Sequence, residues 1–403
     1  MKGWEPLKET KREELRTKRA GATKNTFNLL QIYVSTDQRI NRRSATASGA
    51  NISTFQRINI STYQHSMVKV SVILPVYGVA QYIVKCTESL LAQTLDEMEF
   101  IYVDDHGPDN SIELVKQTIA GHPREGQFRF LKPEHNMGAG MARNFAIPQA
   151  QGEYIAFVDS DDWVEPNMFE ELYNEAKRQG GVDLCYCQAS KDYLDGKPSE
   201  ILKSPEVEPG EFTHAKRVHF LANYVSYFWT FIYRREQIED NAIRYPEERS
   251  ADDSYFVACN LLTAKTIARV DKPFYHYLIR PGSVVTTKNS TKYQKRLAVF
   301  GHLMEYAKSH GVYDEFKAEV DYIYLKKGCL SSVLNYIYNT SEPQREVLAE
   351  IMEELDRQVP DYTANPYLCR RTALRALVYL IRRCPGLALK LLPIYVKKTN
   401  PTV

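Results

Sequence analysis

The sequence predicts an α/β protein in which helices flank a mostly parallel sheet, followed by a C-terminal helical region. Three observations lead to this prediction. Continuous β-rich runs, beginning at 68–76, resemble strands buried on both faces of a parallel sheet. Segments with helical spacing of apolar residues alternate with these runs. After about residue 290 the strand-like runs stop, and long amphipathic stretches replace them.

The expected elements follow each other regularly along the chain. Strands are expected at 68–76, 99–103, 128–131, 153–158 and 182–187, and helices between them at 78–93, 109–120, 138–147 and 167–179. Further helices are expected at about 292–310, 314–338, 343–357 and 370–383. Because ligands of such sheets bind at the carboxyl ends of the strands, we expect the functional site at that edge.

The chain divides into three parts by composition. Residues 1–66 are rich in Ser, Thr, Asn, Gln and Arg and show no sustained period, which predicts a mobile or partly ordered leader. Residues 67–290 would form the sheet domain, and residues 291–403 the helical C-terminal region.

Charge and cysteine content exclude several classes of protein. The leader carries 12 Lys and Arg against 5 Asp and Glu, but the rest of the chain carries 40 against 45, so nucleic acid is not an expected partner. The seven cysteines contain no Cys-x-x-Cys pair, which argues against a disulfide framework and a structural zinc site. No run of 18 apolar residues is present to cross a bilayer. We therefore expect a cytoplasmic protein.

Carboxylates cluster at three places where chemistry could use them. Asp104 and Asp105 follow the second expected strand, Asp159-Ser-Asp-Asp162 follows the fourth, and Asp252-Asp253 comes later. Such a cluster repels itself unless a cation or hydrogen-bond donors lie between its members. Oxygen ligands without His or Cys favour Mg²⁺ or Mn²⁺. Taken singly, each cluster is more typical of a solvated loop or a helix N-terminus than of a functional site.

Taken together and in order, the motifs resemble glycosyltransferase family 2, the inverting enzymes of GT-A fold, whose Rossmann-like sheet is mostly parallel. The resemblance is strongest over residues 68–190 and lapses beyond 290. One departure is visible, because the more frequent Asp-Asp-Gly-Ser loop is here Asp104-Asp105-His106-Gly107. Four motifs carry the resemblance: Ser71-Val-Ile-Leu-Pro-Val-Tyr77, Tyr102-Val-Asp-Asp-His-Gly-Pro-Asp-Asn-Ser111, Asn136-Met-Gly-Ala-Gly-Met-Ala-Arg-Asn144 and Tyr154-Ile-Ala-Phe-Val-Asp-Ser-Asp-Asp-Trp163.

The resemblance implies a donor that is a nucleoside diphosphate sugar, with a UDP-sugar favoured. Asp105 would accept a hydrogen bond from the base, and Asp161, with Asp159, would hold a Mn²⁺ or Mg²⁺ ion on the diphosphate. Arg143 would steady either Asp105 or Asp159. The residues implied in donor nucleotide binding are Pro75, Tyr77, Asp104, Asp105, Arg143, Asn144 and Asp159.

The resemblance also implies roles on the acceptor side. Asp253 matches the general base that removes a proton from the acceptor hydroxyl, and Asp252 and Trp163 would lie against the acceptor or the sugar. Arg280 and Ser283 resemble a loop that closes over the diphosphate. The acceptor would be a glycan or a lipid-linked sugar, in the synthesis of bacterial surface polysaccharide.

Other functions remain open at this point. A sugar nucleotidyltransferase would need a Gly-rich loop where Pro75-Val-Tyr-Gly-Val-Ala stands, and a processive synthase would need membrane spans and a Gln-x-x-Arg-Trp motif. A non-catalytic sugar-nucleotide-binding scaffold of the same fold is the alternative from another class. The basic, apolar stretches 370–383 and 387–398 also allow peripheral contact with the cytoplasmic face of the inner membrane.

Overall fold

The computed structural model describes residues 67–223, 225–280 and 292–399, and residues 65–403 form one compact unit. The predicted leader and Ser283 lie outside the described residues, as does the predicted boundary at 290. The division into domains therefore stays a prediction.

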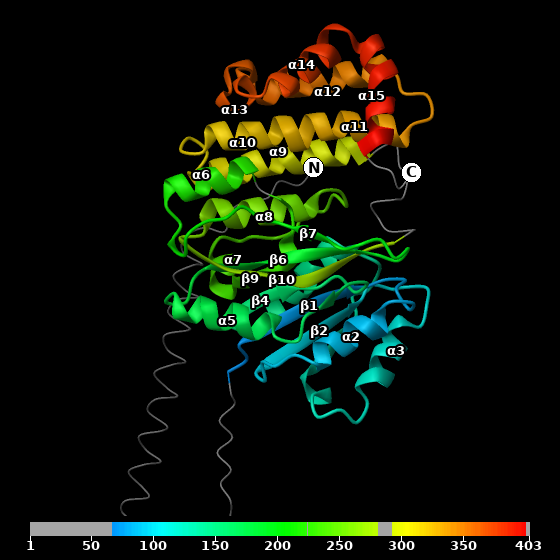
Figure 1. Ribbon diagram of the computed structural model, residues 1–403, viewed down its shortest axis with the longest axis vertical. Coiled ribbons are helices and arrows are strands. Elements are labelled where there is room, and N and C mark those ends of the chain that lie inside the picture. Colours follow the sequence, from blue (N-terminus) through cyan, green and yellow to red (C-terminus); the bar gives the residue numbers. More distant parts are fainter. Residues whose placement is uncertain (1–66, 224, 281–291, 400–403) are drawn as a thin grey trace, which may run out of the picture. The chain divides into compact units, whose positions relative to one another are not determined.

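Within the described residues a ten-stranded sheet forms the centre of the fold (Figure 1). Its main order is β3-β2-β1-β4-β9-β6-β10-β5, with β7 paired to β6 and β8 to β10. The strands are β1 (Val70–Val76), β2 (Met98–Asp104), β3 (Phe128–Leu131), β4 (Tyr154–Phe157), β5 (Trp163–Val164), β6 (Leu184–Tyr193), β7 (Glu200–Leu202), β8 (Gly210–Glu211), β9 (Phe231–Arg234) and β10 (Thr266–Ile279).

The prediction of a mostly parallel sheet flanked by helices is confirmed. β3, β2, β1 and β4 run parallel to one another, as the alternation of strands and helices predicted. β9, which we did not predict, enters antiparallel between β4 and β6. β10 was also missed, because its sequence TIARVDKPFYHYLI interrupts the apolar run with charged residues and a proline. The sheet therefore extends well beyond the five strands that we expected.

Helices cover both faces of this sheet (Figure 1). α2, α3 and α5 lie on one side, and α8 lies on the other, below the C-terminal helices. α4 packs on β1 and β2 and is short. The helices of this part are α2 (Ile83–Leu91), α3 (Ser111–Ile119), α4 (Ala139–Ala146), α5 (Met168–Arg178), α6 (His214–Asn223), α7 (Arg235–Asp240) and α8 (Asp252–Thr263).

The predicted C-terminal helices are present, although one of them is not a regular α-helix. The stretch expected at 314–338 begins as α10 (Lys317–Ile323), passes through a π-helical segment, η4 (Tyr324–Leu330), and continues as α11 (Ser331–Asn339). The remaining helices are α9 (Lys292–Ser309), α12 (Arg345–Gln358), α13 (Pro366–Cys369), α14 (Thr372–Arg383) and α15 (Pro385–Thr399). No helix of the described residues has the length and apolar character needed to cross a membrane.

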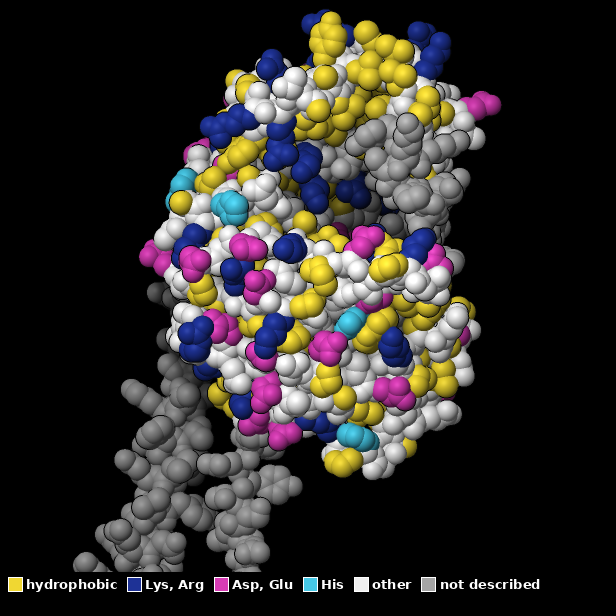
Figure 2. All heavy atoms as spheres, in the orientation of Figure 1, with side chains coloured by type: hydrophobic (Ala, Val, Ile, Leu, Met, Phe, Trp, Pro, Cys, Tyr) yellow, Lys and Arg dark blue, Asp and Glu magenta, His cyan; other side chains and the backbone are white. Residues whose placement is uncertain are grey.

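The outermost helices expose apolar side chains beside basic ones. Figure 2 shows hydrophobic side chains gathered over the α14–α15 end of the molecule, with Lys and Arg around them. The exposed apolar residues are Tyr379, Leu387, Leu391 and Ile394. Residues 370–399 contain eight Lys and Arg and no Asp or Glu. This surface is therefore both apolar and cationic.

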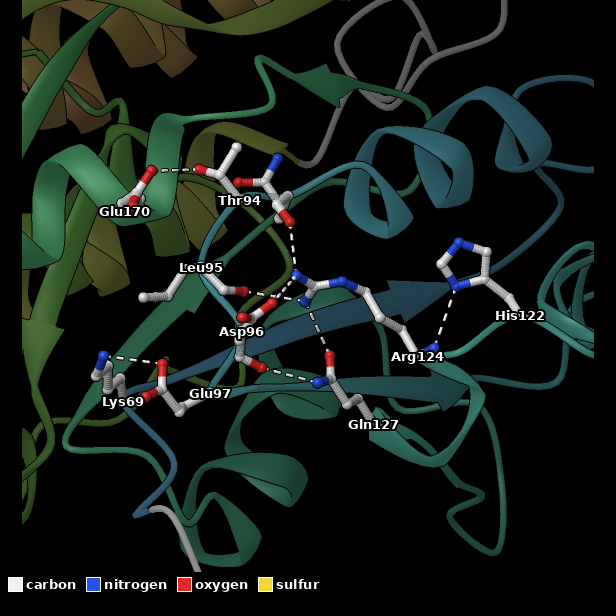
Figure 3. A network of polar contacts seen from close by, with 10 residues as sticks. Lys69, Thr94, Leu95, Asp96, Glu97, His122, Arg124, Gln127 and Glu170 are labelled. Atoms are coloured by element: carbon white, nitrogen blue, oxygen red, sulfur yellow. Dashed lines mark hydrogen bonds and ion pairs between the residues drawn. The ribbon is translucent and has the colours of Figure 1, made fainter.

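Arg124 holds the turn that leads from α2 into β2, at the amino ends of the strands (Figure 3). Its guanidinium donates to the carbonyl oxygens of Gln93 (2.6 Å) and Leu95 (3.0 Å). It also reaches the carboxylate of Asp96 and the side chain of Gln127, both at 3.0 Å. The Gln127 amide in turn donates to the Asp96 carbonyl at 2.8 Å. This network closes the edge of the sheet that faces away from the carboxylate clusters.

Replacement of Arg124 should destabilise the fold without touching the site. We expect Arg124→Met to lower the free energy of unfolding by about 2–3 kcal/mol, because it leaves the carbonyl oxygens of the buried residues Gln93 and Leu95 without this donor. Urea denaturation measures the change. Arg178→Met is the matched control: its side chain is 68% exposed and pairs with Glu175, so a change below about 0.5 kcal/mol is expected. Equal losses in the two variants would contradict this account of the network.

Candidate functional site

The carboxyl ends of β1, β2 and β4 meet at one edge of the sheet. Val76 of β1 pairs with Asp104 of β2, and Ile73 of β1 pairs with Phe157 of β4. The segments that follow these three strands therefore start side by side. Tyr77, directly after β1, is 54% exposed at this edge.

Asp105 binds the segment that leads into α4. Its side chain is buried, and the residue is only 2% exposed. The carboxylate accepts hydrogen bonds from the backbone N–H groups of Met137 (2.6 Å) and Gly138 (2.8 Å) and from the Asn136 amide (3.1 Å). Three donors thus occupy the carboxylate that the resemblance implied for base recognition. Its contact with a base stays a prediction.

The loop after Asp105 adopts a conformation in which glycine is usual. His106, at the position where the more frequent motif has glycine, has a φ of 59°. A left-handed backbone costs a non-glycine residue roughly 1–2 kcal/mol. The imidazole Nε2 lies 2.8 Å from the Pro133 carbonyl oxygen, and Asp104 accepts from the His106 N–H (3.1 Å) and pairs with Lys132 (2.8 Å). These contacts fix the loop that the sequence left in doubt.

Arg143 and Asp159 form a buried ion pair between α4 and the end of β4. The guanidinium Nη2 lies 2.5 Å from Asp159 Oδ1, and the arginine side chain is 5% exposed. The guanidinium also packs 4.4 Å from the ring centre of Phe228 and 5.3 Å from that of Tyr245. Of the two partners that we allowed for Arg143, the structure shows Asp159.

The ion pair sits in a region of excess negative charge. Burial raises the pKa of Asp159 above its usual range, and Arg143 opposes this shift. The charges of Asp161 and Asp253 raise the Asp159 pKa further. Asp161 is two residues from Asp159 in the sequence, whereas Asp253 comes from a distant part of the chain that the fold brings near.

Asn144 and Gly140 tie α4 to the segment that leads into α8. The Asn144 amide donates to the Tyr245 carbonyl (2.7 Å) and its oxygen accepts from the Tyr245 N–H (2.8 Å). Both polar atoms of the Asn144 side chain thus bind the backbone of Tyr245. The predicted position of Asn144 close to a nucleotide stays a prediction. A Cβ added at Gly140 would lie 2.4 Å from Asp252 Oδ2 and 3.2 Å from the Tyr245 Cβ. The glycine allows α8 to approach.

Asp252 and Asp253 begin α8, where the positive end of the helix dipole favours negative charge. Burial, with the nearby charge of Asp253, raises the pKa of Asp252 to about 6. The Asp253 carboxylate accepts from the Ser254 N–H at 2.7 Å. Asp253 is partly exposed, so it remains accessible from the crevice.

Asp161 and Arg280, to which we gave separate roles, contact each other. Arg280 Nε donates to Asp161 Oδ2 at 2.7 Å, and the guanidinium lies 4.9 Å from the ring centre of Tyr82. The arginine therefore neutralises a predicted cation ligand in this structure. The second loop residue of the prediction, Ser283, lies outside the described residues.

The sequence placed Asp162 in a carboxylate cluster without giving it a role, and it did not single out Tyr275. Asp162 is buried, and its carboxylate accepts from the Tyr275 hydroxyl (2.7 Å) and the Leu278 N–H (2.8 Å). The same hydroxyl accepts from the Asp159 N–H at 3.1 Å. Tyr275 thereby attaches the Asp159–Asp162 turn to β10. Nothing in the sequence indicated this role of Tyr275, because β10 and the Asp159–Asp162 turn meet only in the tertiary structure.

Trp163 is used in packing. Its ring stacks on His276 with the ring centres 5.0 Å apart, and the Lys85 ammonium lies 2.9 Å from its centre. His276 itself contacts Asp192 and Glu165, each at 2.9 Å. These contacts lend no support to the predicted role of Trp163 as a floor for the sugar.

The carboxylate set fits a hard divalent ion that is shared with a ligand. The described residues contain no group of three or more His, Cys, Asp and Glu arranged to hold a metal by themselves. Asp159 and Asp161 are each paired with an arginine here, Asp159 with Arg143 and Asp161 with Arg280. Mg²⁺ and similar ions are typically bound by one or two carboxylates together with substrate phosphates. The residues present are consistent with that mode of binding.

Comparison with known proteins gives concordant results. Residues 71–241 match the family model described as glycosyl transferase family 2. EpsH of Bacillus subtilis (strain 168), whose name places it among the glycosyltransferases, is 30% identical over 258 residues, covering 62% of this chain and 73% of EpsH. EpsJ of the same strain, an uncharacterized glycosyltransferase, is 32% identical over 250 residues, covering 58% of this chain and 70% of EpsJ.

A solved structure shares the fold. The structure of S. aureus TarS 1–349 in complex with UDP-GlcNAc aligns with a TM-score of 0.55 at 22% identity, covering 83% of this chain and 92% of that one. At this level of identity the likeness concerns the fold. It confirms the expected GT-A architecture with its C-terminal helices.

The packing of α4 against Asp252 can be tested by adding one methyl group. Alanine normally stabilises a helix by about 0.5–1 kcal/mol relative to glycine. We expect Gly140→Ala to lower the free energy of unfolding instead, because its Cβ collides with Asp252. Gly301→Ala in α9 is the matched control, since a Cβ there meets nothing within 4 Å, and it should stabilise. Urea denaturation of both variants measures the difference. Stabilisation by both substitutions would contradict the close approach of α8.

Proposed function

The chain belongs to glycosyl transferase family 2, and from this premise we propose that it moves a sugar from a UDP-sugar to an acceptor hydroxyl. The acceptor is a glycan or a lipid-linked sugar, in the synthesis of bacterial surface polysaccharide. The observation that carries the proposal is that Asp159 and Asp161 follow β4 and each pair with an arginine, at the edge where the carboxyl ends of β1, β2 and β4 meet. A buried cluster of like charges is expensive unless a cationic or hydrogen-bonding ligand completes it.

In this proposal the nucleotide binds at the edge formed by the carboxyl ends of β1 and β2. The exposed ring of Tyr77 offers a face on which a base can stack, next to the partly exposed Asp104. Pro75 shapes this edge through its carbonyl oxygen, which accepts from the Ser160 hydroxyl at 2.8 Å. Asp105 acts here by holding the 136–138 segment in place.

The diphosphate would lie between Asp161 and Arg280. Donor binding lets Arg280 exchange the Asp161 carboxylate for a phosphate, to which a guanidinium binds equally well through two N–H groups. Asp161 and Asp159 are the residues that would hold Mn²⁺ or Mg²⁺. When bound, such an ion neutralises the charge that develops on the leaving diphosphate. Arg143 keeps Asp159 oriented for this purpose.

Asp253 serves as the general base. Its carboxylate removes the proton from the acceptor hydroxyl as the oxygen attacks the anomeric carbon, and the diphosphate leaves from the opposite side. One direct displacement inverts the anomeric centre. Because an ordinary aspartate is a weak base, most of the rate must come from positioning of the two substrates and from late proton transfer.

The first test is a calorimetric titration of the protein with UDP, with and without Mn²⁺. We expect metal-dependent binding that Asp161→Ala abolishes and that Asp195→Ala, a change of an exposed loop carboxylate, leaves unchanged. Asp253→Asn should still bind UDP but lose transfer by roughly 100-fold or more. Sugar transfer is measured with a labelled UDP-sugar.

Each negative result has a definite meaning. Unchanged turnover in Asp253→Asn would remove Asp253 from the mechanism. Metal-dependent UDP binding without transfer to any glycan tested would favour the non-catalytic sugar-nucleotide-binding scaffold. Binding of GDP or dTDP in place of UDP would keep the fold and change the donor class.

We also propose that the protein binds peripherally to the cytoplasmic face of the inner membrane. The exposed apolar residues of α14 and α15 are surrounded by cationic ones, and residues 370–399 lack acidic residues (Figure 2). An amphipathic basic surface of this kind matches an anionic bilayer. Such binding would bring the crevice near lipid-linked acceptors.

Vesicle sedimentation tests the membrane contact. The protein should sediment with vesicles that contain phosphatidylglycerol and stay in solution with pure phosphatidylcholine vesicles. The double variant Leu391→Ser plus Ile394→Ser should lose most of this binding, because both side chains are exposed on α15. A control that replaces the exposed Leu194 by Ser, on the sheet-containing part, should bind as the parent does. Absence of sedimentation with anionic vesicles would refute the proposal.

A further inference from the structure

The carboxyl-terminal part of β10 lies against the segment that carries the predicted cation ligands. We call residues 159–162 the acidic turn, since the chain reverses there through a hydrogen bond from the Asp162 N–H to the Asp159 carbonyl oxygen (3.0 Å). β5, which follows this turn directly, pairs antiparallel with β10. Tyr275 of β10 and Asp162 are 113 residues apart in the sequence, so only the tertiary structure brings them together.

The Tyr275 hydroxyl binds both ends of the acidic turn. It accepts from the Asp159 N–H at 3.1 Å and donates to the Asp162 carboxylate at 2.7 Å. Ser160 and Asp161 are the two central residues of the turn. One hydroxyl group therefore helps to set the direction in which the Asp161 side chain leaves the backbone.

The position of this hydroxyl is itself fixed. Tyr275 is fully buried, and its ring stacks on that of Trp229, with the ring centres 4.1 Å apart and the ring planes 17° apart. The Asp162 carboxylate, to which the hydroxyl donates, also accepts from the Leu278 N–H of β10 at 2.8 Å. Ring stacking on one side and the anchored carboxylate on the other thus leave the hydroxyl little freedom to move.

Other elements hold the same turn. The Ser160 hydroxyl donates to the Pro75 carbonyl oxygen of β1 at 2.8 Å. The Asp159 carboxylate pairs with Arg143 of α4. Together with Tyr275, these contacts attach the turn to β1, α4 and β10 before any ligand binds. A site that is attached in this way is preorganised, which lowers the cost of binding.

We propose that Tyr275 is a positioning residue for the divalent ion, and that its hydroxyl holds the acidic turn in the arrangement in which Asp159 and Asp161 bind the ion together with the donor diphosphate. This inference rests on the proposed function and adds a residue to it. None of the four motifs that carry the family resemblance contains Tyr275. Metal–ligand distances lie within about 0.2 Å of their ideal values, so a small shift of the turn weakens binding of the ion.

Tyr275→Phe tests this role, because it removes the hydroxyl and keeps the ring. The stacking on Trp229 is retained, so the core stays filled. The Asp159 N–H and the Asp162 carboxylate each lose a partner. The substitution therefore separates positioning of the turn from packing of the core.

The experiment is a calorimetric titration of the full chain with UDP at a series of Mn²⁺ concentrations, combined with urea denaturation. The matched control is Tyr154→Phe. Tyr154 is also fully buried, and its hydroxyl donates to the Val182 carbonyl oxygen at 2.8 Å. It begins β4, whereas the acidic turn follows the other end of that strand. Both substitutions remove one buried hydroxyl, but only Tyr275→Phe loosens the turn.

We expect Tyr275→Phe to need at least about tenfold more Mn²⁺ than the parent for half-maximal UDP binding, since each of the two lost hydrogen bonds contributes a factor of several. Saturating Mn²⁺ should restore UDP binding, because the loss lies in binding of the ion. Tyr154→Phe should keep the Mn²⁺ requirement of the parent, although both variants should lose stability in urea. A purely structural role of Tyr275 would instead lower the fraction of protein that binds UDP and leave the Mn²⁺ requirement unchanged.

Ser160→Ala is a second variant, which loosens the turn from β1. It should also raise the Mn²⁺ requirement, and it decides the question if Tyr275→Phe shows no cooperative unfolding transition. An unchanged Mn²⁺ requirement in Tyr275→Phe, or an equal increase in Tyr154→Phe, would overturn the inference while leaving the proposed function intact. Failure of the parent to bind UDP at any Mn²⁺ concentration would overturn the proposed donor and this inference with it.

Discussion

The buried ion pair between Arg143 and Asp159 is the interaction on which the rest of the site depends. It joins α4 to the end of β4, with the Arg143 side chain buried beside the rings of Phe228 and Tyr245 and the Asp159 side chain 29% exposed. Loss of one partner would leave an uncompensated buried charge, which typically costs about 3–5 kcal/mol. Such a pair contributes little net stability, but it fixes geometry, and here it orients a carboxylate at the crevice.

The short helix α4 organises both halves of the site around this pair. Asp105 holds the segment that precedes the first residue of α4. Asn144, near the end of α4, binds Tyr245 in the segment that leads to α8. Gly140, on the same helix, leaves room for Asp252. Carboxylates from three parts of the chain are thus positioned by one eight-residue helix, which explains why it is rich in small residues.

Electrostatics then distinguishes two parts of the site. After β4, arginines already neutralise the carboxylates, with Arg143 on Asp159 and Arg280 on Asp161. At the start of α8, Asp253 lies near Lys327, which belongs to the C-terminal helices. The family resemblance lapses in those helices, so they are the part of the chain in which a difference in acceptor would be encoded.

Sequence alone determined the alternation of strands and helices that forms the parallel part of the sheet, the strand ends at which carboxylates gather, and the family. These features depend on the local pattern of hydrophobic residues and on short motifs, and both can be read without knowing the fold. Tertiary structure decided what each side chain does. Asp105 binds the segment before α4 because the fold brings together donors that lie about thirty residues away in the sequence. Tyr275 donates to Asp162 because β10 lies beside β6 in the sheet. Lys327 reaches the Ser226 hydroxyl because the π-helical segment η4 places it there, and no periodicity in the sequence encodes such a long-range contact.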